Sequence, residues 1–286
     1  MGKNGAVSSD ERPLPAPSSR SLLLTVLGEL VYPEGEPVYT TALLEVLRGM
    51  EVEDHAARQA ISRSAAAGWI AGKKRGRTVC WSLAPRGREL VEDGMRRSAA
   101  FLSEPDPWDN QWLVLLVTVA QQQRSLRKRL YGGLSWLGMG NPNPGVWVTP
   151  HAEVADGLRS LVADLGLAGS AYAFVGGTRD VGLTDDDIVQ KSWDLSSLEE
   201  HYDALIGRFS GLRPADGDEV LLAHLELLND LQRFIRLDPK LPKELLSEWR
   251  GREAAALIRG LREQWAPLAR ARWHEIAAAA SPRAGG

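Results

Sequence analysis

The sequence predicts an α+β protein built from several domains. Three observations lead to this fold class. Short helical patterns precede two strand-like runs between residues 18 and 100, strands alternate with helices from 108 to 181, and helical periodicity dominates from Ser192 onward. The chain has 286 residues, of which 44% are hydrophobic and 25% are charged, so it can bury more than one core.

The composition excludes several classes of protein. Cys80 is the single cysteine, so neither a disulfide nor a cysteine-based zinc site can form within one chain. Residues 1–17 are polar and punctuated by proline, and we expect a disordered tail without a targeting signal. The longest apolar run, Trp112–Ala120, is too short to span a bilayer. We therefore expect a cytoplasmic protein.

Residues 18–100 predict a succession of short elements, because apolar residues recur at helical spacing and then give way to β-branched and aromatic runs. Serine, threonine and acidic residues at the expected helix starts are good caps, and glycines mark the ends. The expected elements are a helix from Ser18 or Ser19, a helix from Thr40 or Thr41 to Gly49, a helix from Glu53 or Asp54 to Gly68, strands Trp69–Lys73 and Thr78–Leu83, and a helix from Pro85 toward Ala100.

The positive charge of the chain is concentrated in this region, although the whole chain has a net charge of −3. From Asp54 to Arg88 there are eight lysines and arginines and a single acid, Asp54. A solvated surface would account for such a cluster by itself. Its place on a helix and on the tip of a strand pair instead favours contact with nucleic-acid phosphates.

Three helices followed by a basic hairpin are typical of a winged helix-turn-helix, whose second motif helix enters the DNA major groove. On the third predicted helix, arginine and glutamine offer bidentate contacts to bases, while the basic hairpin would contact the backbone. A winged helix can also bind proteins, but the basic cluster favours DNA. The expected DNA-binding residues are Arg58, Gln59, Ser62, Arg63, Lys73, Lys74, Arg75 and Arg77.

Several runs of sequence resemble the PaaX family of transcriptional regulators, which are related to the repressor of phenylacetic acid degradation. The resemblance extends over nearly the whole chain beyond residue 18 and is strongest in the long run from Phe234 to Ala254. The runs that carry it are Asp54–Ile70, Gly76–Arg77, Trp81–Gly87, Lys191–Leu195, Tyr202 and Phe234–Ala254.

The resemblance implies a winged helix, a ferredoxin-like middle domain similar to small CRISPR-associated nucleases, and a helical C-terminal domain. It also implies a homodimer that binds a double-stranded DNA operator and is released by an aryl-acetyl-CoA or related acyl-CoA effector. We expect the tail at 1–17, the winged helix at 18–103, a dimerising middle domain at 108–187, and an effector-sensing and dimerising helical domain at 188–281.

The expected middle domain offers no catalytic residues. Related nucleases place a metal-binding aspartate at the end of the first strand, but here that position reads Val117-Thr-Val-Ala120. The Asp185–Asp187 run follows Thr184 and predicts a helix N-terminus rather than a metal site. The five histidines lack ligand spacing, and no Gly-x-Ser-x-Gly elbow occurs. We expect neither metal nor cofactor and no enzymatic activity; the alternative is a nucleic-acid or CoA-ester processing enzyme built on this domain.

The effector site is not specified by the sequence. Cations near the expected junction of the last two domains could bind CoA phosphates, or they could form ion pairs, for example of Arg233 or Arg236 with Asp230 or Asp238. The candidates are Lys191, Arg208, Arg233 and Arg236. Trp193, Trp249, Trp265 and Trp273 are expected to belong to the core of the helical domain rather than to a ligand cage.

Overall fold

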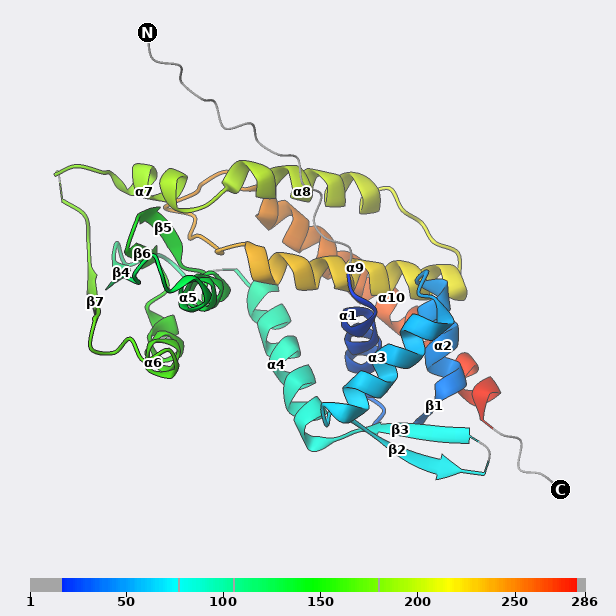
Figure 1. Ribbon diagram of the computed structural model, residues 1–286. Coiled ribbons are helices and arrows are strands. Elements are labelled where there is room, and N and C mark those ends of the chain that lie inside the picture. The colour runs from blue at the N-terminus through cyan, green and yellow to red at the C-terminus, as the bar shows by residue number, and fades with distance from the viewer. Residues whose placement is uncertain (1–16, 77, 105, 180, 282–286) are drawn as a thin grey trace, which may run out of the picture. The chain divides into compact units, whose positions relative to one another are not determined.

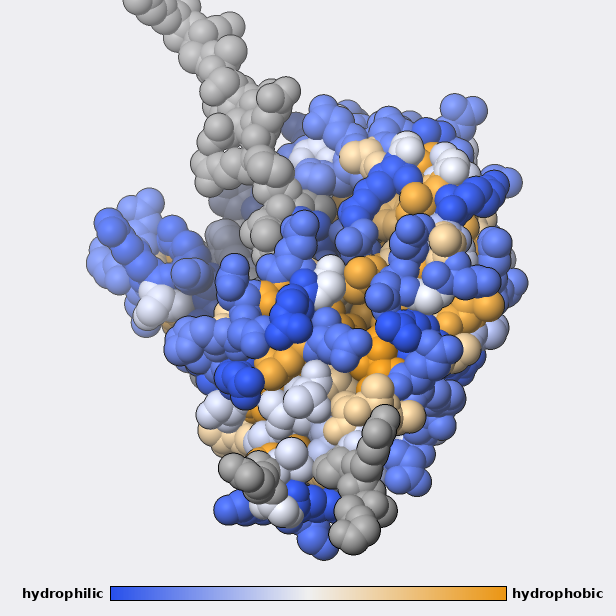
Figure 2. Space-filling view, turned by 90° about the vertical axis from the view of Figure 1, so that its right-hand side faces the viewer, coloured by the Kyte–Doolittle hydropathy of each residue, from blue (hydrophilic) through white to orange (hydrophobic). Residues whose placement is uncertain are grey.

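The computed structural model describes residues 17–76, 78–104, 106–179 and 181–281 (Figure 1). The chain divides into two compact units, residues 1–91 with 275–286 and residues 92–274. Helices are combined with two small antiparallel sheets, so the predicted α+β class is confirmed. No described helix combines the length and the apolar character that a membrane span requires. Hydrophilic residues cover most of the face seen in Figure 2, and hydrophobic residues show in separate areas.

The first unit begins with helices that pack on one another through leucine side chains. Leu23, Leu30, Leu43 and Leu47 are fully buried among them. Leu23 and Leu30 are seven residues apart and Leu43 and Leu47 four, so each pair lies on one side of its helical segment. The elements are α1 (Ser19–Val26), a π-helical turn η1 (Leu27–Val31), α2 (Thr40–Gly49) and α3 (Asp54–Ala66).

The predicted caps of the first two helices have different outcomes. Ser18 caps α1 as expected, because its Oγ accepts a hydrogen bond from Ser21 N at 3.1 Å. The prediction that Thr40 or Thr41 caps α2 is wrong, since Tyr39 holds the N-cap position without a side-chain bond. The hydroxyl of Thr40 instead accepts a hydrogen bond from Trp81 Nε1 at 2.9 Å, which ties α2 to the sheet.

The first sheet has the strand order β1-β3-β2, with antiparallel pairing throughout. Its strands are β1 (Val38–Tyr39), β2 (Ile70–Arg75) and β3 (Thr78–Leu83). β2 extends two residues beyond the predicted end at Lys73, because Lys74 pairs with Val79 and Arg75 with Thr78. The turn is therefore tighter than expected, and Gly76 holds a φ of 60° within it.

The helix α4 (Pro85–Leu102) follows β3 at once and connects the first unit to the second along the chain. Its first turn lies directly against the start of β2. A Cβ atom at Gly87 would lie 1.9 Å from the carbonyl oxygen of Trp69, so only glycine fits there. The requirement for glycine explains how α4 can begin immediately after the strand.

In the second unit, a strand, a helix, two strands, a helix and a strand follow one another. The four strands form a sheet in the order β5-β6-β4-β7. Helices α5 and α6 cover one face, and Leu115, Leu130, Leu134, Trp147 and Leu158 form the core between them. The elements are β4 (Trp112–Val117), α5 (Arg124–Trp136), β5 (Gly140–Asn143), β6 (Val146–Thr149), a 3-10 turn (Ala152–Val154), α6 (Ala155–Asp164) and β7 (Ala171–Gly176).

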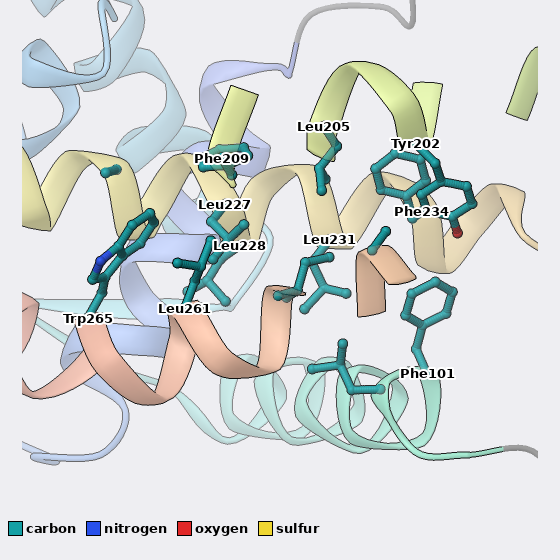
Figure 3. Close-up of a cluster of buried hydrophobic side chains, with 14 of the residues drawn as sticks. Phe101, Tyr202, Leu205, Phe209, Leu227, Leu228, Leu231, Phe234, Leu261 and Trp265 are labelled. Carbon is teal, nitrogen blue, oxygen red and sulfur yellow. The ribbon is translucent and has the colours of Figure 1, made fainter. Parts of the chain in front are cut away.

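Four further helices complete the unit, and three of them build a second core together with α4. Figure 3 shows how side chains from α4, α8, α9 and α10 meet, with the rings of Tyr202 and Phe234 stacked 4.2 Å apart. Trp265 and Trp273 are buried as predicted, whereas Trp193 and Trp249 are only half-buried. The helices are α7 (Asp185–Ser192), α8 (Leu195–Phe209), α9 (Asp218–Leu237) and α10 (Arg250–Ala280).

Candidate nucleic-acid interface

The helix α3 has the two faces that the sequence predicts. Ala57, Ala60, Ile61 and Ser64 are buried against the rest of the first unit. The predicted contact residues of this helix lie on the opposite, exposed side: Arg58, Gln59, Ser62 and Arg63. Because the exposed residues carry the long polar side chains, this face can approach a ligand without disturbing the core.

A chain of side-chain contacts runs along the exposed face of α3. The amide Nε2 of Gln59 lies 2.8 Å from His55 Nε2, and Arg63 Nη2 donates to Gln59 Oε1 at 3.3 Å. The three residues are four positions apart, so their side chains lie on adjacent turns. Gln59 still has one amide N–H and one oxygen lone pair available. A glutamine amide uses these two groups to bind the N7 and N6 atoms of adenine in the major groove. His55 is not among the predicted contact residues, although its i, i+4 spacing to Gln59 can be read from the sequence.

The hairpin of β2 and β3 carries the second group of predicted contacts. Lys73, Lys74 and Arg75 are all exposed at the end of β2. Successive residues of a strand point to opposite faces, so Lys74 lies on the face opposite Lys73 and Arg75. Arg77, the remaining predicted residue, lies outside the described part of the chain.

Aromatic residues hold the base of the hairpin in place. The guanidinium of Arg20 in α1 lies 3.6 Å from the ring centre of Trp69. Trp81 donates to Thr40 and lies over Gly72, where an added Cβ would approach the Trp81 ring to 2.8 Å. The basic tip therefore extends from a fixed base.

The charges of this surface are not neutralised within the described residues. No acidic side chain lies within ion-pair distance of Arg58, Lys73, Lys74 or Arg75 there. The nearby acid Asp54 is already paired with Arg48, whose Nη2 lies 2.8 Å from Asp54 Oδ1. The surface thus presents uncompensated positive charge, as binding to a polyanion requires.

The acidic run that could have suggested a metal site has structural roles instead. Thr184 and Asp187 form a capping box at the start of α7, and these hydrogen bonds from Thr184 lower the pKa of the Asp187 carboxyl. Asp185 Oδ1 accepts from Trp112 Nε1 at 2.8 Å and from Thr178 Oγ1 at 2.9 Å. The predicted helix N-terminus is confirmed. Over the described ranges there is no group of three or more metal-ligating side chains.

The four cations suggested as effector ligands do not form one cluster. Arg208 and Arg233 both pair with Asp230, at 3.4 and 3.2 Å, and Arg208 also pairs with Glu226. Arg236 lies 5.8 Å from the ring centre of Trp136, and Lys191 is exposed in the last turn of α7. Pairing of Arg233 with Asp230 was one of the two alternatives left open by the sequence.

Comparison with known proteins gives three family matches, which follow one another along the chain. Residues 18–87 match the family described as PaaX-like protein, residues 105–189 the PaaX protein central Cas2-like domain, and residues 193–275 the PaaX-like protein C-terminal domain. No curated protein matches the sequence.

Among solved structures, the uncharacterized protein Rv0674 from Mycobacterium tuberculosis is similar, with a TM-score of 0.60 and 20% sequence identity. The match covers 91% of this chain and 98% of the other, which shows a shared fold. Since the three family matches together span most of the sequence, the protein belongs to the PaaX-like family, a family of transcriptional regulators.

Proposed function

We propose that the protein is a sequence-specific DNA-binding repressor, acting as a homodimer and released by an aryl-acetyl-CoA or related acyl-CoA effector. In this proposal residues 18–103 form a winged helix, residues 108–187 a ferredoxin-like domain and residues 188–281 a helical domain that senses the effector. The protein has no catalytic role and acts in the cytoplasm.

The observation that carries the proposal is the unpaired basic surface of α3 and the hairpin, in a family of regulators. The exposed face of α3 holds Arg58 and Gln59, which suit guanine and adenine edges. The connectivity of three helices and the strand order β1-β3-β2 support a winged helix, and the alternation around β4–β7 supports a ferredoxin-like fold.

Selection from a random DNA library tests this function directly. The full chain should enrich a pseudo-palindromic sequence with half-sites about 10 base pairs apart, because a two-fold dimer places equivalent helices in successive major grooves. Footprinting on genomic DNA would then locate the operator. Enrichment of no sequence, or of sites without two-fold symmetry, would contradict the proposal.

The sheet of the second unit offers a surface on which two copies can join. β7 is an edge strand of that sheet, and no charged residue occurs from Ala171 to Gly176. Tyr172 and Phe174 are 71% and 52% exposed, and they pair with Leu116 and Val114 on β4. An antiparallel edge of this kind can pair with its own copy about a two-fold axis, as operator half-sites require.

We expect the chain to have a mass in light scattering of about twice 31.3 kDa. Phe174→Lys should shift the mass toward one chain, since a charge on an edge strand opposes pairing with another strand. Val181→Lys places the same charge at an exposed position beyond the strand and should leave the dimer intact. A wild-type monomer at micromolar concentration would contradict the dimer. If Phe174→Lys leaves the dimer intact, the interface does not include the edge of β7.

A further inference from the structure

A pocket opens between the C-terminal end of α4 and the N-terminal end of α10, entirely within residues 92–274. It contains about 400 Å³ of empty space, part of which is open to solvent. This places it toward the small end of the range for ligand sites. Its apolar wall consists of Phe101, Leu241, Trp249 and Ala255, and its charged residues are Glu104, Asp238, Lys240, Arg252 and Arg259.

The three cations of the pocket contact neutral carbonyl oxygens. Lys240 Nζ donates to the carbonyl oxygens of Ala100 and Ser103, both at 2.5 Å. Arg259 Nη1 donates to the carbonyl of Leu102, and Arg252 Nη2 to that of Leu246. Among the described residues, no carboxylate lies within ion-pair distance of these cations.

Asp238, a half-buried acid of the pocket, accepts hydrogen bonds from other donors. Asp238 Oδ2 accepts from Tyr202 Oη at 2.6 Å and from Trp249 Nε1 at 3.0 Å, and Oδ1 accepts from Lys240 N at 2.6 Å. The Asp238 carboxylate therefore accepts hydrogen bonds from aromatic side chains and from the backbone, and it forms no ion pair with the cations of the pocket. Burial lowers the pKa of the Lys240 ammonium, although Asp238 and Glu104 oppose this effect. A half-buried ammonium without a close counter-ion gains from an added anion.

The first turn of α10 completes the positive side of the pocket. Gly251 lines it, and a Cβ there would come within 2.4 Å of Trp249 Nε1 and 2.9 Å of Asp238 Oδ2. No side chain fits at this position, so the helix backbone itself borders the pocket. The unpaired N–H groups of a helix N-terminus favour negative charge, in the same sense as the nearby cations.

We propose that this pocket binds a small organic acid, with its carboxylate on Lys240 and Arg259 and its aromatic or branched apolar part against Phe101 and Trp249. Phe101 extends from α4 into the edge of the apolar core, and Figure 3 shows it below the Tyr202 and Phe234 rings. The guanidinium of Arg259 keeps N–H groups beyond the one on Leu102, and Lys240 keeps a third. Binding is thus possible before any existing contact breaks.

The pocket would also give the ligand a way to act on α4. Lys240 and Arg259 are the cations that satisfy the carbonyls at the end of this helix. A carboxylate held by the remaining N–H groups draws Lys240 and Arg259 toward itself and weakens their bonds to the last turn of α4. This helix continues without a break into the part of the chain proposed to bind DNA. This consequence rests on the proposed function; the binding itself does not.

Calorimetry on the full chain without DNA tests the binding. The probes are the carboxylates benzoate, phenylacetate and hexanoate, and benzamide is the uncharged counterpart of benzoate. Inorganic phosphate and CoA are included to distinguish a carboxylate ligand from a phosphate ligand. We expect at least one carboxylate to bind while its amide does not. Arg259→Gln should weaken this binding about tenfold or more, because a charge-assisted hydrogen bond is lost. Arg270→Gln, on the same helix but outside the pocket, is the matched control.

A second pair of variants changes the space without changing the charge. Ala255→Phe fills the pocket and should abolish binding, whereas Ala256→Phe, on the exposed side of α10, should not. Failure of every carboxylate to bind at millimolar concentration would overturn the proposal. So would phosphate binding that equals carboxylate binding and survives Ala255→Phe, since a simple cation patch would then suffice. Loss of DNA binding in any variant bears only on the proposed function.

Discussion

Asp238→Ala is expected to lower the free energy of unfolding by about 3 kcal/mol. The substitution leaves the fully buried Tyr202 hydroxyl and the Trp249 indole N–H without an acceptor. Each unsatisfied buried group costs about 1–3 kcal/mol, and the two effects need not be additive. Burial and the Asp238 charge raise the pKa of Tyr202, so the hydroxyl stays protonated and cannot dispense with its acceptor.

Urea denaturation, followed by circular dichroism of the full chain, measures this effect. Asp238→Asn should be affected less than Asp238→Ala, because the amide oxygen can still accept from Tyr202 and Trp249. Its NH₂ group then faces the N–H of Lys240, so some stability is lost. Asp216→Ala, an exposed acid in the loop before α9, is the matched control. If Asp238→Ala and Asp216→Ala unfold at the same urea concentration, the helical core does not depend on Asp238 as a hydrogen-bond acceptor.

The second large effect concerns DNA. Arg58→Ala or Gln59→Ala should lower the affinity for the selected operator by about 1–3 kcal/mol and relax the preference at one base pair. Lys74→Ala should instead weaken binding to all sequences alike and make the dependence of log K on log salt less steep by about one unit. The two classes differ because α3 offers groups that match base edges, whereas the tip of β2 offers point charges.

Fluorescence anisotropy with operator and scrambled duplexes, repeated at several salt concentrations, separates the two classes. Glu45→Ala, on the exposed side of α2, is the control for a surface substitution in the same unit. If Lys74→Ala changed the sequence preference while Arg58→Ala changed only the salt dependence, the roles of the helix and the hairpin would be reversed.

The elements with strong local signals could be predicted from the sequence. α3 begins at Asp54, as expected from an acid at a helix start, and its buried residues recur at helical spacing. A continuous run of large apolar residues predicts a strand at Trp112–Val119, and β4 forms there but ends two residues earlier, at Val117. In both cases the local preference and the tertiary contacts agree.

Other elements form only because a partner strand is present. β5 consists of Gly140, Asn141, Pro142 and Asn143, which have low strand propensity, and it was not predicted. It pairs with β6 at the sheet edge, where proline is tolerated, and Asn141 Nδ2 donates to the carbonyl of Val146 at 2.6 Å. The two-residue strand β1 likewise depends on pairing with Trp81 and Cys80 of β3. No local pattern marks either strand.

The candidate sites differ in the same way. The residues proposed to contact DNA are close together in the sequence, so a helical period and a charge count suffice to propose them. The acid-binding pocket joins Phe101 to residues 238–259, and one of its cations, Lys240, holds a φ of 56° that Asp238 stabilises through a backbone hydrogen bond. A site assembled from residues so far apart in sequence depends on the packing of α4, α9 and α10, which periodicity does not specify.

The uncharged edge of β7 has a consequence for the fate of newly made chains. In a single chain, the segment Ala171–Gly176 pairs with β4 on one side only. Its other edge is unpaired, has high β-propensity and carries no charge to block addition of another strand. Unassembled chains should therefore be prone to aggregation, most of all during strong overproduction, when folding intermediates are abundant. Phe174→Lys would act as a gatekeeper against such aggregates. The same substitution that weakens the proposed dimer should thus increase the yield of dispersed protein.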